Sequence, residues 1–225
     1  MGRPGAAKPV SKSVLVLDYG MGNLRSVAQA VRAAAQGLGL EVLVGCDPAQ
    51  VRAADRIVLP GQGAMRDCMA HFTASGARDA VLAEVANGKP LMGVCVGMQM
   101  LLEHSEEQDT AGLGLFPGRV KRFQLAGRMQ EDGSRFKVPQ MGWNRVDIAR
   151  PHPLWHGIAS GSHFYFVHSY HAAPERPEQI AATTTYGEPF AGAIARDTIF
   201  ATQFHPEKSA ADGLRLYRNF LTWQP

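Results

Sequence analysis

The sequence predicts an α/β protein with a central, mostly parallel sheet, and three observations lead to this prediction. Short, fully apolar runs alternate with amphipathic helical patterns through roughly the first hundred residues, as in parallel strands that are buried on both faces. Several of these runs end in glycine-containing turns, where such proteins pass from strand to helix. From about residue 112 to residue 195 the pattern changes to short strands separated by glycine and proline, which predicts a smaller antiparallel extension against the parallel core.

The elements of the parallel part follow from apolar runs and helical periodicity. Predicted strands cover residues 14–17, 41–44, 56–59 and 91–95, and predicted helices cover residues 24–35, 65–72 and 77–87. Asn23 is a suitable N-cap for the first helix. The apolar run after Cys95, as far as residue 102, predicts a further buried helix.

The second half of the chain supplies the predicted extension and closes the core. Strands are expected at residues 118–123, 143–148, 163–170, 179–186 and 198–204, and a final helix at residues 210–221. The first 12 residues are rich in glycine, proline and basic residues and have no apolar core, so we predict a flexible leader there rather than a secretory signal. One domain is expected over residues 13–225.

Composition narrows the classes of function. With 45% hydrophobic and 19% charged residues, the chain has the composition of a soluble globular protein, and no apolar run approaches membrane-spanning length. The formal net charge is only +3 and the basic residues are scattered, so neither nucleic acid nor a membrane is an expected partner. The three cysteines, Cys46, Cys68 and Cys95, form no CxxC pair. We therefore expect a reduced, cytoplasmic protein without a structural metal.

Cys95 is the first candidate for chemistry. It follows an apolar strand and is flanked by Gly93 and Gly97, which relieve crowding at a sharp turn from which a nucleophile can project. The first N–H groups of the following helix favour an anion and so favour the thiolate. Gln99, four residues on, would share a helix face with Cys95 and offer its carboxamide to a substrate. Taken alone, a buried cysteine that only packs explains this pattern equally well.

His205 and Glu207 favour a catalytic role for Cys95 over simple packing. They lie two residues apart after the strand predicted at residues 198–204, so their side chains point to the same side and the carboxylate can orient the imidazole. This is the base and orienting group of a nucleophilic triad. The ends of parallel strands meet at one edge of a sheet, which would bring both residues to Cys95. Another turn, Gly61-Gln62-Gly63, follows a strand and can present N–H groups to an oxyanion, although by itself a simple loop explains it better.

Together, these motifs resemble those of a known family. GVCVGMQ at 93–99 and QFHPEKS at 203–209 resemble the class I glutamine amidotransferases, whose triad is Cys-His-Glu. DYGMGNLRSV at 18–27, LPGQGAM at 59–65, PQMGWN at 139–144 and YFVHSY at 165–170 are similar to the glutaminase subunits of imidazole glycerol phosphate synthase, an enzyme of histidine biosynthesis. The resemblance implies a flavodoxin-like glutaminase fold and no cofactor.

The resemblance also implies a reaction. Cys95 would attack the side-chain amide of glutamine to form a thioester, His205 would transfer protons, and Glu207 would orient the imidazole ring. The N–H of Val96 and one N–H from residues 61–63 would bind the oxyanion, and Gln99 with Ser169 and Tyr170 would hold the amino-acid end of the substrate. Water would then release glutamate.

A partner is implied as well. In this family the glutaminase forms a heterodimer with a cyclase subunit, a (β/α)₈ barrel that receives the ammonia through a channel and makes imidazole glycerol phosphate and AICAR. The positions that match the partner face are Gln140, Trp143, Asn144, Tyr165 and Lys208. Gln140 replaces the usual histidine of PHMGWN, and Gln62 replaces the usual valine of PGVG. Neither change removes a member of the triad, and the change at Gln62 leaves the backbone N–H groups in place but bears on how the turn flips between resting and active forms.

Three other functions are compatible with some of these motifs. The chain could be the glutaminase of another amidotransferase, such as anthranilate or GMP synthase, but MGWN and YFVHSY favour the first assignment. It could be a γ-glutamyl hydrolase or cysteine peptidase that uses the same triad on a larger substrate. A non-catalytic relative is disfavoured because Cys95, His205 and Glu207 are all present. Cys46 and Cys68 are expected to be structural or incidental.

Overall fold

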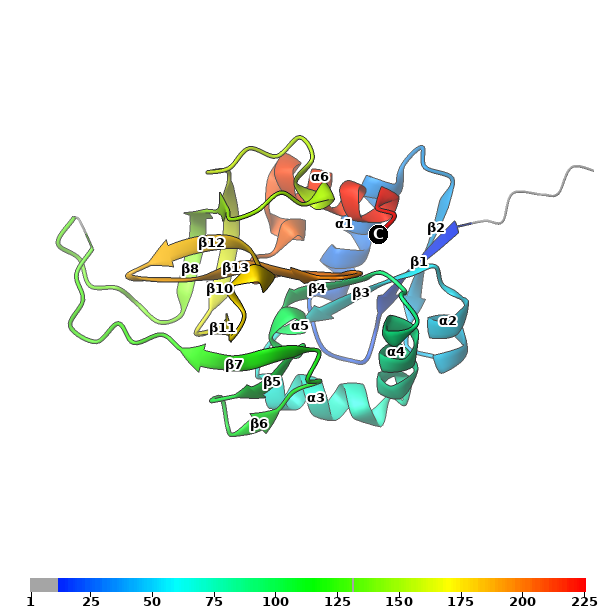
Figure 1. The fold of residues 1–225 in the computed structure, drawn as a ribbon, viewed down its shortest axis with the longest axis horizontal. Coiled ribbons are helices and arrows are strands. Elements are labelled where there is room, and N and C mark those ends of the chain that lie inside the picture. Colours follow the sequence, from blue (N-terminus) through cyan, green and yellow to red (C-terminus); the bar gives the residue numbers. More distant parts are fainter. Residues whose placement is uncertain (1–11, 131) are drawn as a thin grey trace, which may run out of the picture.

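The computed structural model describes residues 12–130 and 132–225. Its centre is an eight-stranded sheet in the order β2-β1-β3-β4-β14-β13-β12-β9 (Figure 1). Every pairing from β2 to β14 is parallel, and every pairing from β14 to β9 is antiparallel. The predicted parallel core with an antiparallel extension is therefore confirmed. The predicted leader lies outside the described residues except for Lys12, which opens β1.

The parallel half closely follows the predicted elements. Its strands are β1 (Lys12–Leu17), β2 (Leu40–Gly45), β3 (Arg56–Gly61), β4 (Leu91–Cys95) and β14 (Ile199–Thr202), and its helices are α1 (Leu24–Ala35), α2 (Pro48–Ala53), α3 (Met65–Ala74), α4 (Ala77–Ala86) and α6 (Ala210–Thr222). All residues of β3, β4 and β14 are buried. This is the pattern expected when helices cover both faces of a parallel sheet. Figure 1 shows α1 and α6 on one face and α3 and α4 on the other.

The antiparallel extension is built from the remaining strands. They are β5 (Leu102–Ser105), β6 (Thr110–Ala111), β7 (Phe116–Arg122), β8 (Gln140–Arg145), β9 (Asp147–Ile148), β10 (His163–His168), β11 (Tyr170–Pro174), β12 (Ile180–Tyr186) and β13 (Glu188–Arg196). β9, β12 and β13 continue the main sheet, whereas β8 pairs with β10 and the order β11-β7-β5-β6 forms a third sheet. Single-turn 3₁₀ helices occur at Pro153–Trp155, Pro177–Gln179 and Pro206–Lys208.

Several local predictions need correction, among them the strand at 163–170, which is divided at Ser169 between β10 and β11. The buried helix after Cys95 is a single turn, α5 (Val96–Gln99), because Leu102 already begins β5. An apolar run that is buried on all sides has no periodicity that separates helix from strand. The strand predicted at 143–148 is split between β8 and β9. Asn23 occupies the N-cap of α1, but its side chain makes no capping hydrogen bond.

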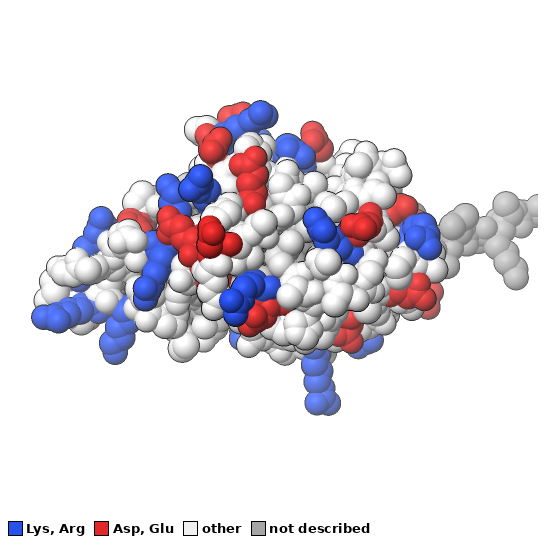
Figure 2. Space-filling model, turned by 90° about the horizontal axis from the view of Figure 1, so that it is seen from below, with Lys and Arg blue, Asp and Glu red and all other residues white. Residues whose placement is uncertain are grey.

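Charged side chains are mixed over the surface. On the face shown in Figure 2, Lys and Arg are interspersed with Asp and Glu on a largely uncharged surface, and Lys and Arg are more frequent at the end formed by the segment between β7 and β8. No helix among the described residues is long and apolar enough to cross a membrane.

Candidate active site

Cys95 projects from a strained turn at the end of β4. Its φ of 54° lies in the left-handed region, which is rare for a residue with a side chain. The backbone around it is crowded, since a Cβ on Gly97 would lie 2.0 Å from the carbonyl oxygen of Leu59, and one on Gly93 would lie 3.0 Å from the Cβ of Ala201. Glycine at both positions allows β3, β4 and β14 to approach this closely, so the predicted sharp turn is present.

His205 and Glu207 meet Cys95 at the same edge of the sheet. β4 lies between β3 and β14, and the chain reaches His205 three residues after the end of β14. Nδ1 of His205 and Oε1 of Glu207 are 2.8 Å apart, and the two side chains are 4% and 0% exposed. The backbone N–H of His205 donates to the Tyr165 carbonyl at 2.9 Å, and the Ser209 hydroxyl donates to the His205 carbonyl at 2.6 Å. The imidazole is therefore held in one orientation.

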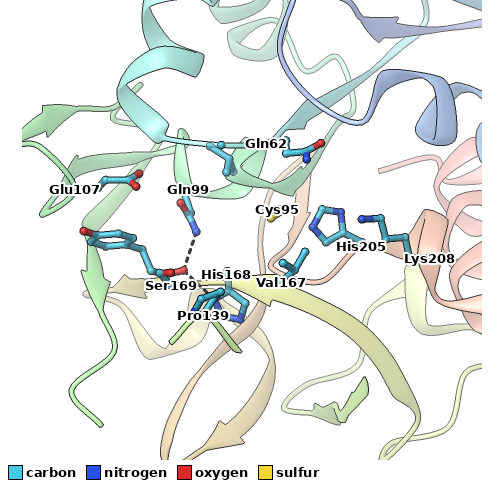
Figure 3. A pocket seen from close by; sticks show the side chains of 13 residues that line it. Gln62, Cys95, Gln99, Glu107, Pro139, Val167, His168, Ser169, His205 and Lys208 are labelled. Carbon is cyan, nitrogen blue, oxygen red and sulfur yellow. Dashed lines mark hydrogen bonds between the residues drawn. The ribbon is translucent and has the colours of Figure 1, made fainter. Parts of the chain in front are cut away.

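The second ring nitrogen of His205 faces the sulfur. Nε2 is buried and forms no hydrogen bond of ordinary length with another described residue. The side chain of Cys95 lies beside it (Figure 3). Burial by itself would lower the pKa of His205, but Cys95 and the Glu207 carboxylate outweigh burial and raise this pKa to about 10. The site thus favours an imidazolium next to the sulfur, which is the charge arrangement of an activated cysteine.

A cavity of about 270 Å³ opens onto these residues. Its lining comprises Gln62, Gly63, Cys95, Val96, Gln99, Glu107, Pro139, Val167, His168, Ser169, Tyr170, His205 and Lys208. In Figure 3, Gln99 and Glu107 lie on one side of Cys95, and His205 and Lys208 lie on the other. The side-chain N–H of Gln99 donates to the Tyr170 carbonyl at 2.8 Å, which orients its carboxamide. Chain segments that are far apart in the sequence therefore surround the sulfur with both charged and neutral polar groups.

Glu107 is a cavity residue that the sequence did not single out. Its carboxylate accepts a hydrogen bond from the N–H of Met65 at the start of α3, at 2.8 Å, and its side chain is only partly buried. A fixed carboxylate at a cavity wall can bind an ammonium group. Glu107 follows another glutamate in a turn between β5 and β6, and nothing in the sequence distinguishes it from a solvated surface acid.

The turn after β3 packs directly on the backbone after the nucleophile. A Cβ on Gly61 would lie 2.6 Å from the amide nitrogen of Gly97, and Gly63 has a φ of +84°. Gln62 and Gly63 line the cavity together with Val96, whereas Gly61 lies behind them. The residues expected to supply oxyanion donors are therefore adjacent in space.

Gln140, expected at or near the partner interface, has a buried side chain in this chain. It is 2% exposed, and its Oε1 lies 3.1 Å from Nε2 of His168, whose Nδ1 lies 2.9 Å from the Tyr170 carbonyl oxygen. Side chains alternate along β8, so Gln140 points inward while Met141 and Trp143 point outward. Burial lowers the pKa of His168 to about 3, so this ring is neutral at physiological pH.

Acidification below about pH 6.5 is expected to destabilise the protein through His168. Its pKa is 6.5 unfolded and about 3 folded, so the unfolded state binds the extra proton. The stabilisation is complete above pH 6.5 and is lost as the pH falls through the folded pKa, at about 1.4 kcal/mol per pH unit. The free energy of unfolding can be measured in urea at several pH values between 7 and 5. Its dependence on pH should be less steep in His168→Gln than in the wild type, by the equivalent of about one proton. Equal slopes for variant and wild type would contradict this prediction.

Four other residues expected on the partner face lie at the surface or partly exposed. Trp143 is 54% exposed and packs edge-on against Tyr165, with 6.3 Å between ring centroids. Nζ of Lys208 lies 5.6 Å from the centroid of the Tyr165 ring. Asn144 donates to the Thr185 carbonyl at 2.9 Å. With Met141, which is 65% exposed, Trp143, Tyr165 and Lys208 form an apolar and cationic cluster that borders the cavity at Lys208.

Nothing among the described residues is arranged as a metal centre. No group of three or more His, Cys, Asp or Glu side chains in residues 12–130 and 132–225 is placed to hold a metal ion. Cys46, Cys68 and Cys95 are not joined in disulfides.

Comparisons with known proteins agree on one family. The family model described as "Glutamine amidotransferase class-I" matches residues 15–223. The imidazole glycerol phosphate synthase subunit HisH of Dechloromonas aromatica is 54% identical over 214 residues, which cover 95% of this chain and 98% of that one. HisH of Aromatoleum aromaticum is 53% identical over 212 residues, covering 94% and 99% of the two chains. A solved structure described as a glutamine amidotransferase has a TM-score of 0.68 at 20% identity, covering 92% of this chain and 96% of that one, which shows the shared fold.

Proposed function

This chain belongs to the class I glutamine amidotransferase family and, within it, to the HisH subunits of imidazole glycerol phosphate synthase; on this premise we propose how its residues act. It is a glutaminase subunit of histidine biosynthesis. The Cys95 thiolate attacks the side-chain amide carbon of glutamine, and the His205 imidazolium gives its proton to the departing ammonia. Water, deprotonated by His205, then cleaves the thioester and releases glutamate, while Glu207 keeps the ring oriented.

The surrounding groups recognise substrate and transition state. The N–H of Val96 and an N–H of the turn at residues 61–63 bind the oxyanion. Gln99, Ser169 and Tyr170 bind the amino-acid end, and the Glu107 carboxylate binds its ammonium group. This proposal is supported above all by the His205–Glu207 pair, which faces Cys95 inside a cavity of suitable polarity.

Ammonia is the product that the partner consumes. We infer a heterodimer with a cyclase subunit, a (β/α)₈ barrel, which converts its ribonucleotide substrate to imidazole glycerol phosphate and AICAR in the cytoplasm. The cluster of Met141, Trp143, Tyr165 and Lys208 supports docking at the cavity mouth, because methionine and aromatic side chains are enriched in interfaces and both Met141 and Trp143 are more than half exposed. Ammonia released beside Cys95 would then pass into the partner without crossing bulk water.

Glutamine hydrolysis is expected to be weak for the isolated chain and to rise at least tenfold when the cyclase subunit and its ribonucleotide are added. The physical reason is that docking and nucleotide binding bias the oxyanion turn toward its productive form. Steady-state release of glutamate, measured with each component omitted in turn, checks this. Fast release by the isolated chain that does not change on addition of both components would contradict the gated function.

Three further measurements test the partner and the reaction separately. Trp143→Ala should weaken association with the cyclase without altering unassisted hydrolysis, since Trp143 lies outside the cavity lining. Faster turnover of γ-glutamyl peptides than of glutamine would favour a γ-glutamyl hydrolase or peptidase. Association with a chorismate-using or ATP-using enzyme would favour another amidotransferase.

A further inference from the structure

Two buried side chains bond to the backbone at the end of β3 and in the turn that follows it, residues 60–63. The Tyr19 hydroxyl donates to the Pro60 carbonyl at 2.5 Å, and the Cys68 thiol donates to the Gln62 carbonyl at 3.3 Å. Tyr19 follows β1, the strand beside β3, and Cys68 lies on α3, which begins after the turn. Tyr19 is 4% exposed and Cys68 is 0% exposed. Two different elements therefore anchor the turn through carbonyl groups two residues apart.

Both anchors are rigid and remain hydrogen-bond donors. The Tyr19 ring packs against Phe72 of α3 with 5.4 Å between centroids, and its hydroxyl also lies 3.7 Å from the Met100 sulfur. Burial is the largest cause that raises the pKa of Tyr19, and it raises the pKa of Cys68 as well. Neither group ionises near neutral pH, so the phenol and the thiol keep the protons that they donate.

Peptide geometry links the direction of each anchored carbonyl group to that of the N–H group of the next residue. In a trans peptide the carbonyl and the N–H point in opposite directions. Fixing the Pro60 carbonyl therefore fixes the direction of the Gly61 N–H, and fixing the Gln62 carbonyl fixes that of the Gly63 N–H. The Gly61–Gln62 peptide is left as the intervening hinge. Gln62 and Gly63 line the cavity beside Cys95, so the two anchored carbonyl groups belong to backbone that lies at or next to the cavity wall.

We propose that Tyr19 and Cys68 are positioning residues that hold the oxyanion-binding turn in place for glutamine hydrolysis. This rests on the proposed function, and it gives Cys68 a role beyond packing. Both side chains act only through the backbone of residues 60–63. Correctly placed N–H groups stabilise the transition state more than they stabilise the bound substrate. The loss of an anchor should therefore lower kcat and leave KM nearly unchanged.

The test uses the complex with the cyclase subunit and its ribonucleotide. Tyr19→Phe removes one hydroxyl, and Cys68→Ala removes the thiol; each should lower kcat about tenfold, less than the loss of a whole oxyanion donor, and leave KM within about twofold. Cys68→Ser keeps a donor and should restore most of kcat. Cys46→Ala is the matched control, because Cys46 is a thiol far from the turn in sequence and makes no hydrogen bond to it.

A second readout separates the turn from the triad. Alkylation of Cys95 by iodoacetamide, followed on its own peptide by mass spectrometry, needs the activated sulfur but forms no oxyanion. Its rate should stay unchanged in Tyr19→Phe and Cys68→Ala. Wild-type kcat in both variants, or a parallel fall in alkylation and hydrolysis, would overturn the positioning role. Absence of glutamine hydrolysis by the wild-type complex would instead overturn the proposed function.

Discussion

Replacement of Cys95 by alanine is expected to lower the stimulated hydrolysis of glutamine by on the order of 10⁴-fold or more, because no other group can form the thioester. Cys95 is 3% exposed, and alanine removes the sulfur without adding volume to the turn. The measurement is glutamate release by the complex with the cyclase subunit and its ribonucleotide.

The control for this change is the ability to fold and to bind the partner. Cys95→Ala should unfold cooperatively and associate with the cyclase as the wild type does, and Cys46→Ala should keep its activity. The same Cys95→Ala complex should still make the cyclase products when it is supplied with ammonium salts. Glutamine turnover that survives in Cys95→Ala would refute the assigned nucleophile.

Gly97→Ala is expected to lower the free energy of unfolding by about 3 kcal/mol or more. A Cβ there would lie 2.0 Å from the Leu59 carbonyl oxygen and 3.0 Å from the Leu59 carbonyl carbon. Both atoms are backbone atoms of β3, so relief requires moving that strand and the turn that follows it. Glutamine hydrolysis should therefore fall together with the free energy of unfolding, measured by urea denaturation.

Gly39→Ala is the matched comparison. No atom lies within 4 Å of a Cβ placed on Gly39, and its φ of +62° makes alanine unfavourable by about 1 kcal/mol through backbone strain alone. The difference between the two variants isolates the steric collision. Equal stabilities would show that the backbone around Gly97 yields at little cost.

Periodicity was informative where a segment has one buried face or lies in a fully buried strand. The strands at 14–17 and 91–95 and the helix at 24–35 correspond to β1, β4 and α1. Periodicity failed after Cys95, because residues 96 to 102 are all buried and a continuous apolar run is compatible with a helix, a turn or a strand.

The site shows a similar division. Cys95, His205 and Glu207 could be selected because glycine-flanked cysteine and HxE at strand ends combine into a recognisable chemical unit. Glu107 could not, since its importance comes from the folding of the turn between β5 and β6 over the cavity. Gln140 was expected at or near the partner interface on resemblance alone, and only the structure shows that its side chain is buried against His168.

The sequence by itself determined the parallel core, the family, and the choice of Cys95, His205 and Glu207 as the candidate triad. These properties depend on local pattern: the period of apolar residues, glycines at a crowded turn, and residue types at short spacing. Only the tertiary structure decided that Tyr19 and Cys68, 49 residues apart in the chain, both bond to the turn after β3. Hydrogen bonds between segments that are distant in the chain depend on how helices and strands pack across the sheet. This packing cannot be predicted from a local sequence pattern.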